Sequence, residues 1–513
     1  MNWTRAGLAL LAVVTAGALL LSGGDEAGPK TPAGLPGLPP PFLGVAVLGD
    51  GGLTAAVDAY GNVVDLRAPG PAGRALIENP AERQAAGTVA ADTGIQPWVR
   101  VGEGPALPMW RADRVRQRYL PGTSVLETVA LFDGERVEIL QAARGQVLAM
   151  AVDGGDASVE IRVNADLECE RQRDGRAVTL LCRADRRDGG SPLDETLAAD
   201  QRWLERSRPL GAGAPAWAQR MYERSLLTLR AFTDRRNGAV AAGARDGWAY
   251  VWPRDAGAVA IALAAAGYRP EAELATRFLL GAGIEQAARF NGDGSPVPGR
   301  AAQGDAIGWV AAASQAAGIG NARQAAHILA GGQPIPWRNR ADYWEGESGD
   351  YLGNAIASGA DVSEFSPHIW GESSDTPTGR GLVREAGESE SGLDSAAAWA
   401  VRPFPRPSLF EPARRTLLRL AGEASPYGLL PGEGWEGGED PWSAPTAWTA
   451  WSLAALGERG KALRLLAALR RSATPAGDLP ERVDAETGIP SSTTPLVWSH
   501  AFAILALREL WPS

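Results

Sequence analysis

The spacing of apolar residues divides the chain into two parts that differ in predicted secondary structure. The first part, residues 42–190, consists of short β-rich runs separated by the turn pairs Gly61-Asn62, Asp133-Gly134 and Gly154-Gly155. Such runs between turn pairs are typical of antiparallel hairpins. We therefore predict an antiparallel β-sandwich domain over 42–190. After a connecting segment at 191–213, nearly all of the sequence over 214–513 is predicted to be helical.

Two kinds of helix alternate in the second part. Amphipathic helices are predicted at 216–232, 270–286, 409–424 and 460–473, and helices that are apolar nearly all round at 255–267, 306–317, 394–401, 443–456 and 496–507. A helix with one apolar stripe lies at a surface, whereas a helix that is apolar all round is covered on every side. The alternation predicts an inner ring of helices surrounded by an outer ring, which is an (α/α)₆ barrel.

A polar or Trp-bearing cluster recurs at the start of each inner hairpin. The clusters are marked by Asp255, Asp305, Glu345, Asp394, Asp440 and Trp498. They are spaced by about 50 residues, roughly one helical hairpin, which predicts six hairpins. An outer helix is expected within 361–392, where the Gly-, Ser- and Glu-rich sequence gives little sign of one. Since the inner helices of such a barrel all run in one direction, we expect the clusters to line a pocket at one mouth.

The N-terminal segment is apolar. One Arg precedes the apolar stretch Ala6–Leu21, and Ser22-Gly23-Gly24 follows it. This pattern predicts a secretory signal peptide over 1–24, with an uncleaved membrane anchor as the alternative. Residues 25–41 are predicted to form a Pro-rich, semi-rigid linker. We expect a protein that is secreted, or tethered to the membrane outside the cytoplasm.

Charge and composition exclude several classes of function. A net charge of −10 and a pI of about 5.2 argue against a nucleic-acid partner. The two Cys and the scattered His327, His368 and His500 argue against a zinc site, so no metal is expected. No P-loop, G-x-S-x-G elbow or convincing dinucleotide motif is present, and no cofactor is expected.

The two cysteines flank one predicted hairpin. Cys169 and Cys182 enclose "ERQRDGRAVTLL". A two-residue turn at Gly175-Arg176 would place them directly opposite each other and allow a disulfide, whereas a turn at Asp174-Gly175 would misalign them by one pair.

The segment "AYVWPRDAGAVAIALAAAGY" (249–268) carries the first candidate chemistry. It places Tyr250, Trp252, Arg254 and Asp255 at the start of an apolar helix. Helix-start preferences alone explain a Pro and an acid there. Six such entrances around one mouth instead favour a blind pocket of carboxylates and indoles, which suits an exo-acting glycosidase. The chain has 18 Trp, whose flat faces can bind sugars, although many of them are expected to pack in the core.

Several motifs resemble those of glycoside hydrolase family 15, the glucoamylase family, in its bacterial form of a β-sandwich followed by an (α/α)₆ barrel. In chain order they are "RYLPGTSVLET" (118–128), "YVWPRDAG" (250–257), "QGDAIG" (303–308), "DYWEGE" (342–347), "LDSAAAWAVRPF" (393–404), "GGEDPWSAPTAW" (437–448) and "LPERVDAETGIPSSTTPLVWSHA" (479–501). The resemblance extends over nearly all of the chain after the signal segment. It implies an α-glucan or oligosaccharide substrate, cleaved from its non-reducing end with release of β-glucose.

The resemblance also implies roles for single residues. Glu345 is implied as the general acid and Glu481 as the general base. Arg254 and Asp255 are implied to hold the terminal glucose, and the further expected substrate-binding residues are Tyr250, Trp252, Asp305, Trp344, Trp442 and Trp498. Inverting hydrolysis needs the two carboxyls about 6.5–9.5 Å apart. We expect the wall of Trp344 to desolvate Glu345 and keep it protonated, and Arg482 to keep Glu481 ionised.

Other interpretations stay open. Gly346 stands where the family has a second Glu, Gly304 replaces a usual Leu, and the 346–392 region is short. Rival acids are Glu347, Glu372, Glu436 and Glu439. A degenerate barrel that binds glycan without cleaving it is one alternative, and a structural protein of the cell envelope is another. The linkage, α-1,4, α-1,6 or α,α-1,1, is not decided by these motifs.

Overall fold

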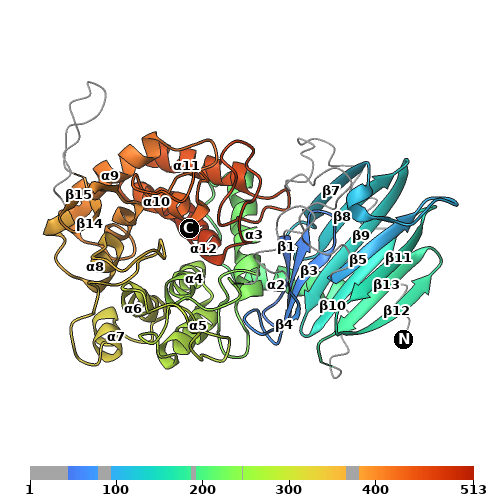
Figure 1. Ribbon diagram of the computed structural model, residues 1–513, viewed down its shortest axis with the longest axis horizontal. Coiled ribbons are helices and arrows are strands. Elements are labelled where there is room, and N and C mark those ends of the chain that lie inside the picture. The colour runs from blue at the N-terminus through green and yellow to red at the C-terminus, as the bar shows by residue number, and fades with distance from the viewer. Residues whose placement is uncertain (1–43, 79–93, 186–191, 245–246, 366–380) are drawn as a thin grey trace.

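The computed structural model describes residues 44–78, 94–185, 192–244, 247–365 and 381–513. The predicted signal segment and linker lie outside these residues, as do His368 and Glu372. The described part forms a β-sheet domain followed by a helical domain beside it (Figure 1). None of the helices in these ranges is long and apolar enough to span a bilayer.

Two antiparallel sheets make up the first domain. One has the order β1-β2-β3-β5-β11, with β4 paired to β3 and β6 to β5, and contains β1 (Gly44–Gly49), β2 (Thr54–Asp58), β3 (Val63–Ala68), β4 (Arg74–Ile77), β5 (Gly94–Arg100), β6 (Leu107–Pro108) and β11 (Ser158–Asn164). The other has the order β12-β13-β10-β9-β8-β7 and contains β7 (Arg114–Tyr119), β8 (Leu126–Phe132), β9 (Glu135–Arg144), β10 (Val147–Asp153), β12 (Glu168–Asp174) and β13 (Ala177–Arg183). Side chains of both sheets, among them Leu48, Val57, Ile139 and Met150, share one buried core.

Two of the three predicted turn pairs close hairpins, and the third does not. Gly61-Asn62 joins β2 to β3, and Asp133-Gly134 joins β8 to β9. The interpretation of Gly154-Gly155 as a hairpin turn is wrong, because β10 pairs with β9 and β13 whereas β11 pairs with β5 in the other sheet. This turn therefore carries the chain from one sheet to the other. Local sequence marks a turn but does not specify which strands pair across it.

The last hairpin of this domain carries a disulfide between Cys169 and Cys182. The register of β12 and β13 sets Cys169 directly opposite Cys182 and Asp174 opposite Ala177. The turn is thus Gly175-Arg176, the first of the two predicted alternatives. Gly175 has φ of +59°, which glycine adopts without the clash that a Cβ would cause.

The second domain is built from helices, most of which agree closely with the predicted ranges, although the helices at 322–329 and 352–358 had no predicted range. They are α2 (Pro192–Glu205), α3 (Ala216–Phe232), α4 (Pro253–Ala266), α5 (Arg269–Gly281), α6 (Ala306–Ala317), α7 (Ala322–Leu329), α8 (Leu352–Ser358), α9 (Phe410–Gly422), α10 (Ser443–Ala455), α11 (Arg459–Ser472) and α12 (Val497–Leu510). Short 3₁₀ helices are η1 (Met109–Arg111), η2 (Ser363–Phe365), η3 (Ser395–Ala400) and η4 (Pro407–Leu409). Helix α2 lies within the predicted connecting segment and packs on β9 and β10.

The apolar helices contact one another in a closed circuit. Around it, α4 contacts α6, α6 contacts α8, α8 contacts η3, η3 contacts α10, α10 contacts α12, and α12 contacts α4. The amphipathic helices α5, α7, α9 and α11 lie outside this circuit in Figure 1, each against one of its members. This arrangement explains the two sequence patterns, since the helices of the circuit are covered on every side.

Small residues allow the inner helices to approach closely. A Cβ at Gly308 would lie 2.3 Å from the carbonyl oxygen of Ala357, and a Cβ at Gly353 would lie 2.8 Å from the ring of Trp399. A side chain fits at neither position, because its Cβ would clash with the backbone at Gly308 and with a packed indole at Gly353. The Gly- and Ala-rich composition of the inner segments therefore follows from their crossing distance.

Two predicted helices differ from expectation. The inner segment expected at 394–401 is the short 3₁₀ helix η3. The outer helix expected within 361–392 is not present in the described part of that range, where η2 and the hairpin β14 (Val383–Glu385) and β15 (Glu388–Leu393) occur instead. Residues 382–393 lack the apolar stripe at helical spacing that an outer helix needs to pack on the circuit.

Candidate active site

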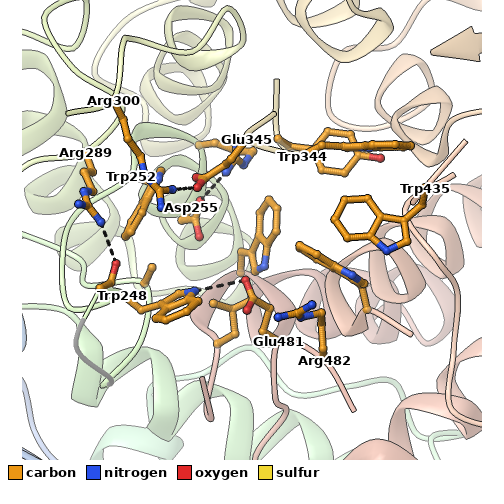
Figure 2. Close-up of a pocket in the computed structure, with 17 residues that line it drawn as sticks. Trp248, Trp252, Asp255, Arg289, Arg300, Trp344, Glu345, Trp435, Glu481 and Arg482 are labelled. Carbon is orange, nitrogen blue, oxygen red and sulfur yellow. Dashed lines mark hydrogen bonds and ion pairs between the residues drawn. The ribbon is translucent and has the colours of Figure 1, made fainter. Parts of the chain in front are cut away.

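A cavity of about 480 Å³ opens at the N-terminal ends of α4, α10 and α12. Its lining residues are Ala242, Gly247, Trp248, Trp252, Arg254, Asp255, Arg289, Arg300, Tyr343, Trp344, Glu345, Trp435, Trp442, Glu481, Arg482, Leu496 and Trp498. Figure 2 shows Glu345 and Glu481 on opposite sides of the cavity, with Asp255 between them. Three segments that are far apart in the sequence thus place three carboxyl groups around the same cavity.

A tight turn presents Glu345. The side chain of Asp342 accepts a hydrogen bond from the backbone N–H of Trp344 (3.0 Å), and its carbonyl accepts one from Glu345 (3.1 Å). Asp342 is buried and forms an ion pair with Arg384 of β14 (3.2 Å), whose guanidinium stacks on Trp344. Glu345 itself has φ of +58°, a conformation that costs energy for a residue with a side chain and recurs at functional sites.

The surroundings of Glu345 differ from those expected. Its side chain is 27% exposed and forms an ion pair with Arg300, while the side-chain amide of Gln303 donates to its second oxygen (3.4 Å). Trp344 stacks on Arg384, and a cation beside Glu345 favours the ionised carboxyl. Trp344 packs on Arg384 as well as lining the cavity, and the expectation that its wall keeps Glu345 protonated stays a prediction.

Glu481 is more deeply buried, at 9% exposure. One of its carboxylate oxygens accepts a hydrogen bond from the indole N–H of Trp248 (3.2 Å), and the other accepts one from the hydroxyl of Ser492. Arg482, expected to keep Glu481 ionised, instead lies over the ring of Trp442 (5.5 Å). Two neutral donors thus hold the Glu481 side chain, and the cation whose charge interacts with it is Arg300.

A buried polar network fixes the segment that carries Glu481. The hydroxyls of Tyr119, at the end of β7, and Thr228 donate to Asp478 (2.8 and 2.9 Å). The backbone N–H of Leu479 donates to Nε2 of His500 (2.9 Å), so the other ring nitrogen carries the proton toward Ser225. Burial lowers the pKa of His500 to about 3, and the ring is neutral. The β-sheet domain thus contacts the segment that carries Glu481 directly through Tyr119.

Arg254 and Asp255, at the start of α4, form a buried charged group with Asp305, at the start of α6. Arg254 pairs with Asp255 (3.4 Å) and Asp305 (3.2 Å), and it donates to Gln303 (2.8 Å). Burial raises the pKa of Asp255 to about 7, although Arg254 acts in the opposite direction. Nε of Arg254 and one oxygen of Asp255 have no hydrogen-bond partner among the described residues. Arg254 and Asp255 line the cavity, so a bound ligand could satisfy these two atoms.

The tryptophans divide between the cavity and the core. Among the described residues, six line the cavity, namely Trp248, Trp252, Trp344, Trp435, Trp442 and Trp498. Trp309, Trp399 and Trp448 are fully buried and pack edge to face. The interpretation of indoles as sugar platforms is thus available for the six and excluded for Trp309, Trp399 and Trp448.

Two expected binding residues lie outside the cavity lining. Asp305 is fully buried and supports Arg254 from behind, and the ring of Tyr250 lies against Arg289 (4.7 Å). The rival acids Glu347, Glu436 and Glu439 are exposed and do not line the cavity. The lining residues that sequence reasoning missed include Trp248, Arg289, Arg300 and Trp435. Trp248 lies two residues before the "YVWPRD" motif, and this short separation was the one signal in the sequence that could have identified it as a lining residue.

Within the described ranges, no group of three or more His, Cys, Asp or Glu side chains is placed to hold a metal ion.

The glycine at position 304, where the resembled family usually has Leu, has a structural reason. A Cβ there would lie 2.6 Å from the side chain of Asn354, which donates to the carbonyls of Arg340 and Ala341. The amide thus occupies the space that a larger residue at 304 would need, and it holds the segment leading to Glu345.

We expect Asp255 to make stability fall with rising pH. Its folded pKa of about 7 is above the ordinary 3.8, so the folded state binds the proton more tightly. The associated stability is full below about pH 4 and is lost as the pH rises through about 7. Urea unfolding of Asp255→Asn should show a smaller loss between about pH 5 and 8 than the wild type. Asp293→Asn, at an exposed turn, serves as control, and equal losses in all three proteins would contradict the assignment.

Comparison with known proteins gives similarity at the level of structure. No model of a protein family matches the chain, and no curated protein sequence matches it significantly. A bacterial glucoamylase solved in complex with acarbose superimposes with a TM-score of 0.68, over 95% of this chain and 96% of that chain, at 13% sequence identity. The chain has a glucoamylase-like fold.

Two further solved structures resemble the chain over a smaller share. A wild-type glycosidase has a TM-score of 0.48 at 19% identity, over 58% of this chain and 99% of its own. A glucoamylase from Saccharomycopsis fibuligera has a TM-score of 0.45 at 14% identity, over 59% of this chain and 97% of its own. The glucoamylase-like fold of the whole chain therefore rests on the bacterial structure, which includes both domains.

Proposed function

We propose that the circuit of helices is an (α/α)₆ barrel and that the protein is an exo-acting, inverting α-glucoside hydrolase. The observation that carries the proposal is the cavity that presents Glu345 and Glu481 from opposite sides, beside the Arg254–Asp255 pair. Two carboxyl groups on opposite sides of a sugar are what single-displacement hydrolysis requires. The bacterial glucoamylase of similar fold binds acarbose, which supports an oligosaccharide as the substrate class here.

In the proposed reaction, Glu345 donates a proton to the glycosidic oxygen while the bond from that oxygen to the anomeric carbon breaks. Glu481 accepts a proton from a water molecule, whose oxygen bonds to the anomeric carbon from the opposite face. The products are β-glucose and the shortened chain with a new hydroxyl. Trp248 and Ser492 hold the Glu481 carboxylate toward the water. Glu345 must separate from Arg300 and bind a proton before it can act as the acid.

The first product decides between inversion and other outcomes. We expect the purified protein to release glucose from one of maltose, isomaltose, dextran, starch or trehalose. Proton NMR during the first minutes should show the β anomer, because the water attacks opposite the α-linked leaving group. On starch or dextran, where the released glucose comes from the cleaved bond, initial appearance of α-glucose would instead mean retention and would remove Glu481 from the role of base.

A specific observation favours one alternative, a glycan-binding protein without hydrolytic activity. The carboxyl of Glu345 is engaged in an ion pair with Arg300, and Gly346 supplies no acid at the next position to replace it. Such a protein would bind oligosaccharides in the cavity, which quenching of the six lining tryptophans would report, but would release no glucose from any of the five substrates.

We infer that the protein acts outside the cytoplasm. The apolar segment Ala6–Leu21 and the disulfide between Cys169 and Cys182 support export, since disulfides persist in oxidising compartments. We expect N-terminal sequencing of the exported protein to begin near Asp25. Recovery of the intact Met1 end in the membrane fraction would instead favour a tethered enzyme.

A further inference from the structure

The cavity is rich in arginine. Arg254, Arg289, Arg300 and Arg482 line it, together with only three acids, Asp255, Glu345 and Glu481. Asp305 lies behind Arg254, so four carboxyl groups stand against the four arginines, but they are not paired one to one. Arg254 pairs with both Asp255 and Asp305, and Arg300 pairs with Glu345. Arg289 and Arg482 therefore need a separate explanation.

Arg289 is held in place without an acidic partner. Its guanidinium lies over the rings of Tyr250 (4.7 Å) and Trp252 (5.7 Å), and one of its terminal nitrogens donates to the carbonyl of Gly247 (3.1 Å). No carboxylate pairs with it among the described residues, and its Nε has no hydrogen-bond partner there. Stacking on the two rings fixes the orientation of the Arg289 guanidinium group. Since no carboxylate of the described residues neutralises it, its charge is available to a ligand in the cavity.

Arg300 reaches the same side of the cavity as Arg289 (Figure 2). Burial and the positive charge of Arg289 both lower the pKa of Arg300, whereas the charge of Glu481 acts in the opposite direction. The carboxylate that Arg300 contacts is Glu345. On the opposite side, Arg482 lies over Trp442 and also has an Nε without a hydrogen-bond partner in the described residues.

A neutral sugar does not require this arrangement. Hydroxyl groups are bound adequately by neutral donors and by one charged pair, which Arg254 and Asp255 already supply. Two neighbouring guanidinium groups on one wall are unfavourable unless an anion lies between them, and their fork of donors matches the oxygens of a carboxylate or a phosphate.

We propose that the sugar bound in this cavity carries an anionic group, a carboxylate or a phosphate, and that Arg289 and Arg300 are the residues that select it. This inference rests on the proposed function, because it names the substrate class of the same site. It also explains how Glu345 is released. An anion on the substrate replaces Glu345 as the partner of Arg300, and the freed carboxyl can then bind the proton that it donates.

Binding of three monosaccharides tests the selection. Tryptophan fluorescence of the full-length protein would be titrated with glucose, glucuronate and glucose 6-phosphate, the last two separating carboxylate from phosphate. We expect one of the anions to bind about tenfold or more tightly than glucose. Arg289→Gln should abolish this preference. Arg338→Gln, which removes an arginine stacked on Trp337 outside the cavity, should keep it.

Hydrolysis separates this inference from the proposed function. Two disaccharides of the same linkage would be compared, one with a neutral and one with an anionic terminal sugar. Faster cleavage of the anionic one supports both ideas. Equal or faster cleavage of the neutral one, or binding of glucose as tightly as both anions, overturns the anion selectivity and leaves the hydrolase standing. Selective binding of an anion without cleavage supports the selectivity and removes the hydrolase.

Discussion

Glu481→Gln is expected to lower the rate of hydrolysis by at least about 10²–10⁴-fold on every substrate. The amide is close to the carboxylate in shape and can still accept from Trp248 or Ser492, but it cannot take a proton from water. An activated substrate such as a glycosyl fluoride should not rescue the variant, because the missing step is the activation of water. Steady-state rates on the natural linkage and on the fluoride measure this.

Glu345→Gln is the matched variant, with a different expected pattern. It should lose a similar factor on an ordinary glycoside but retain most of its rate on the fluoride, whose leaving group needs little protonation. Circular dichroism and sugar binding should be unchanged in both variants. If Glu345→Gln loses the fluoride activity as well, or if Glu481→Gln keeps it, the assignment of acid and base is wrong.

Asp342→Ala is expected to destabilise the protein by about 3–5 kcal/mol, because it leaves the charge of Arg384 largely buried and unpaired. The side chains of Asp342 and Arg384 are only 2% and 13% exposed, and Asp342 also caps the turn that presents Glu345. Urea unfolding measures the loss, and activity should fall with it, since the turn loses its hydrogen bond to Trp344.

The double variant Asp342→Ala with Arg384→Met is the control. It removes both charges, so the unpaired guanidinium no longer contributes, and its stability should exceed that of Asp342→Ala alone. The loss in the free energy of unfolding of the double variant could instead equal the sum of the losses of the two single variants. That result would show that the ion pair adds nothing and that the turn hydrogen bonds account for the effect.

The sequence determined much of the secondary structure. The predicted helices 216–232 and 306–317 coincide with α3 and α6, and the end of α4 falls at Gly267, which has φ of +99°. Helix periodicity, helix ends and two-residue turns depend on residues a few positions apart, so a single sequence contains the information. The same holds for the disulfide, whose alignment needs only the position of one turn.

Prediction fails where a residue's neighbours come from distant segments. The local sequence predicts a hairpin at Gly154-Gly155, although the strands on either side of it lie in different sheets. It also places Trp344 beside Glu345 but gives no sign that Arg384, 40 residues later, packs on the indole. Adjacent residues in a sequence often point in different directions, so adjacency is a poor guide to the partner of a charged side chain.

The candidate site combines both kinds of information. Glu345, Glu481, Arg254 and Asp255 could be named from local motifs, because each motif contains its own reactive group. That they share a cavity, and that Arg289 and Arg300 line it with them, was decided by the tertiary structure. The closed circuit of helices brings the ends of α4, α10 and α12 together, and only this closure sets the charge around each carboxyl group. The sequence therefore determined which groups are available for chemistry, and the fold decided their electrostatic partners.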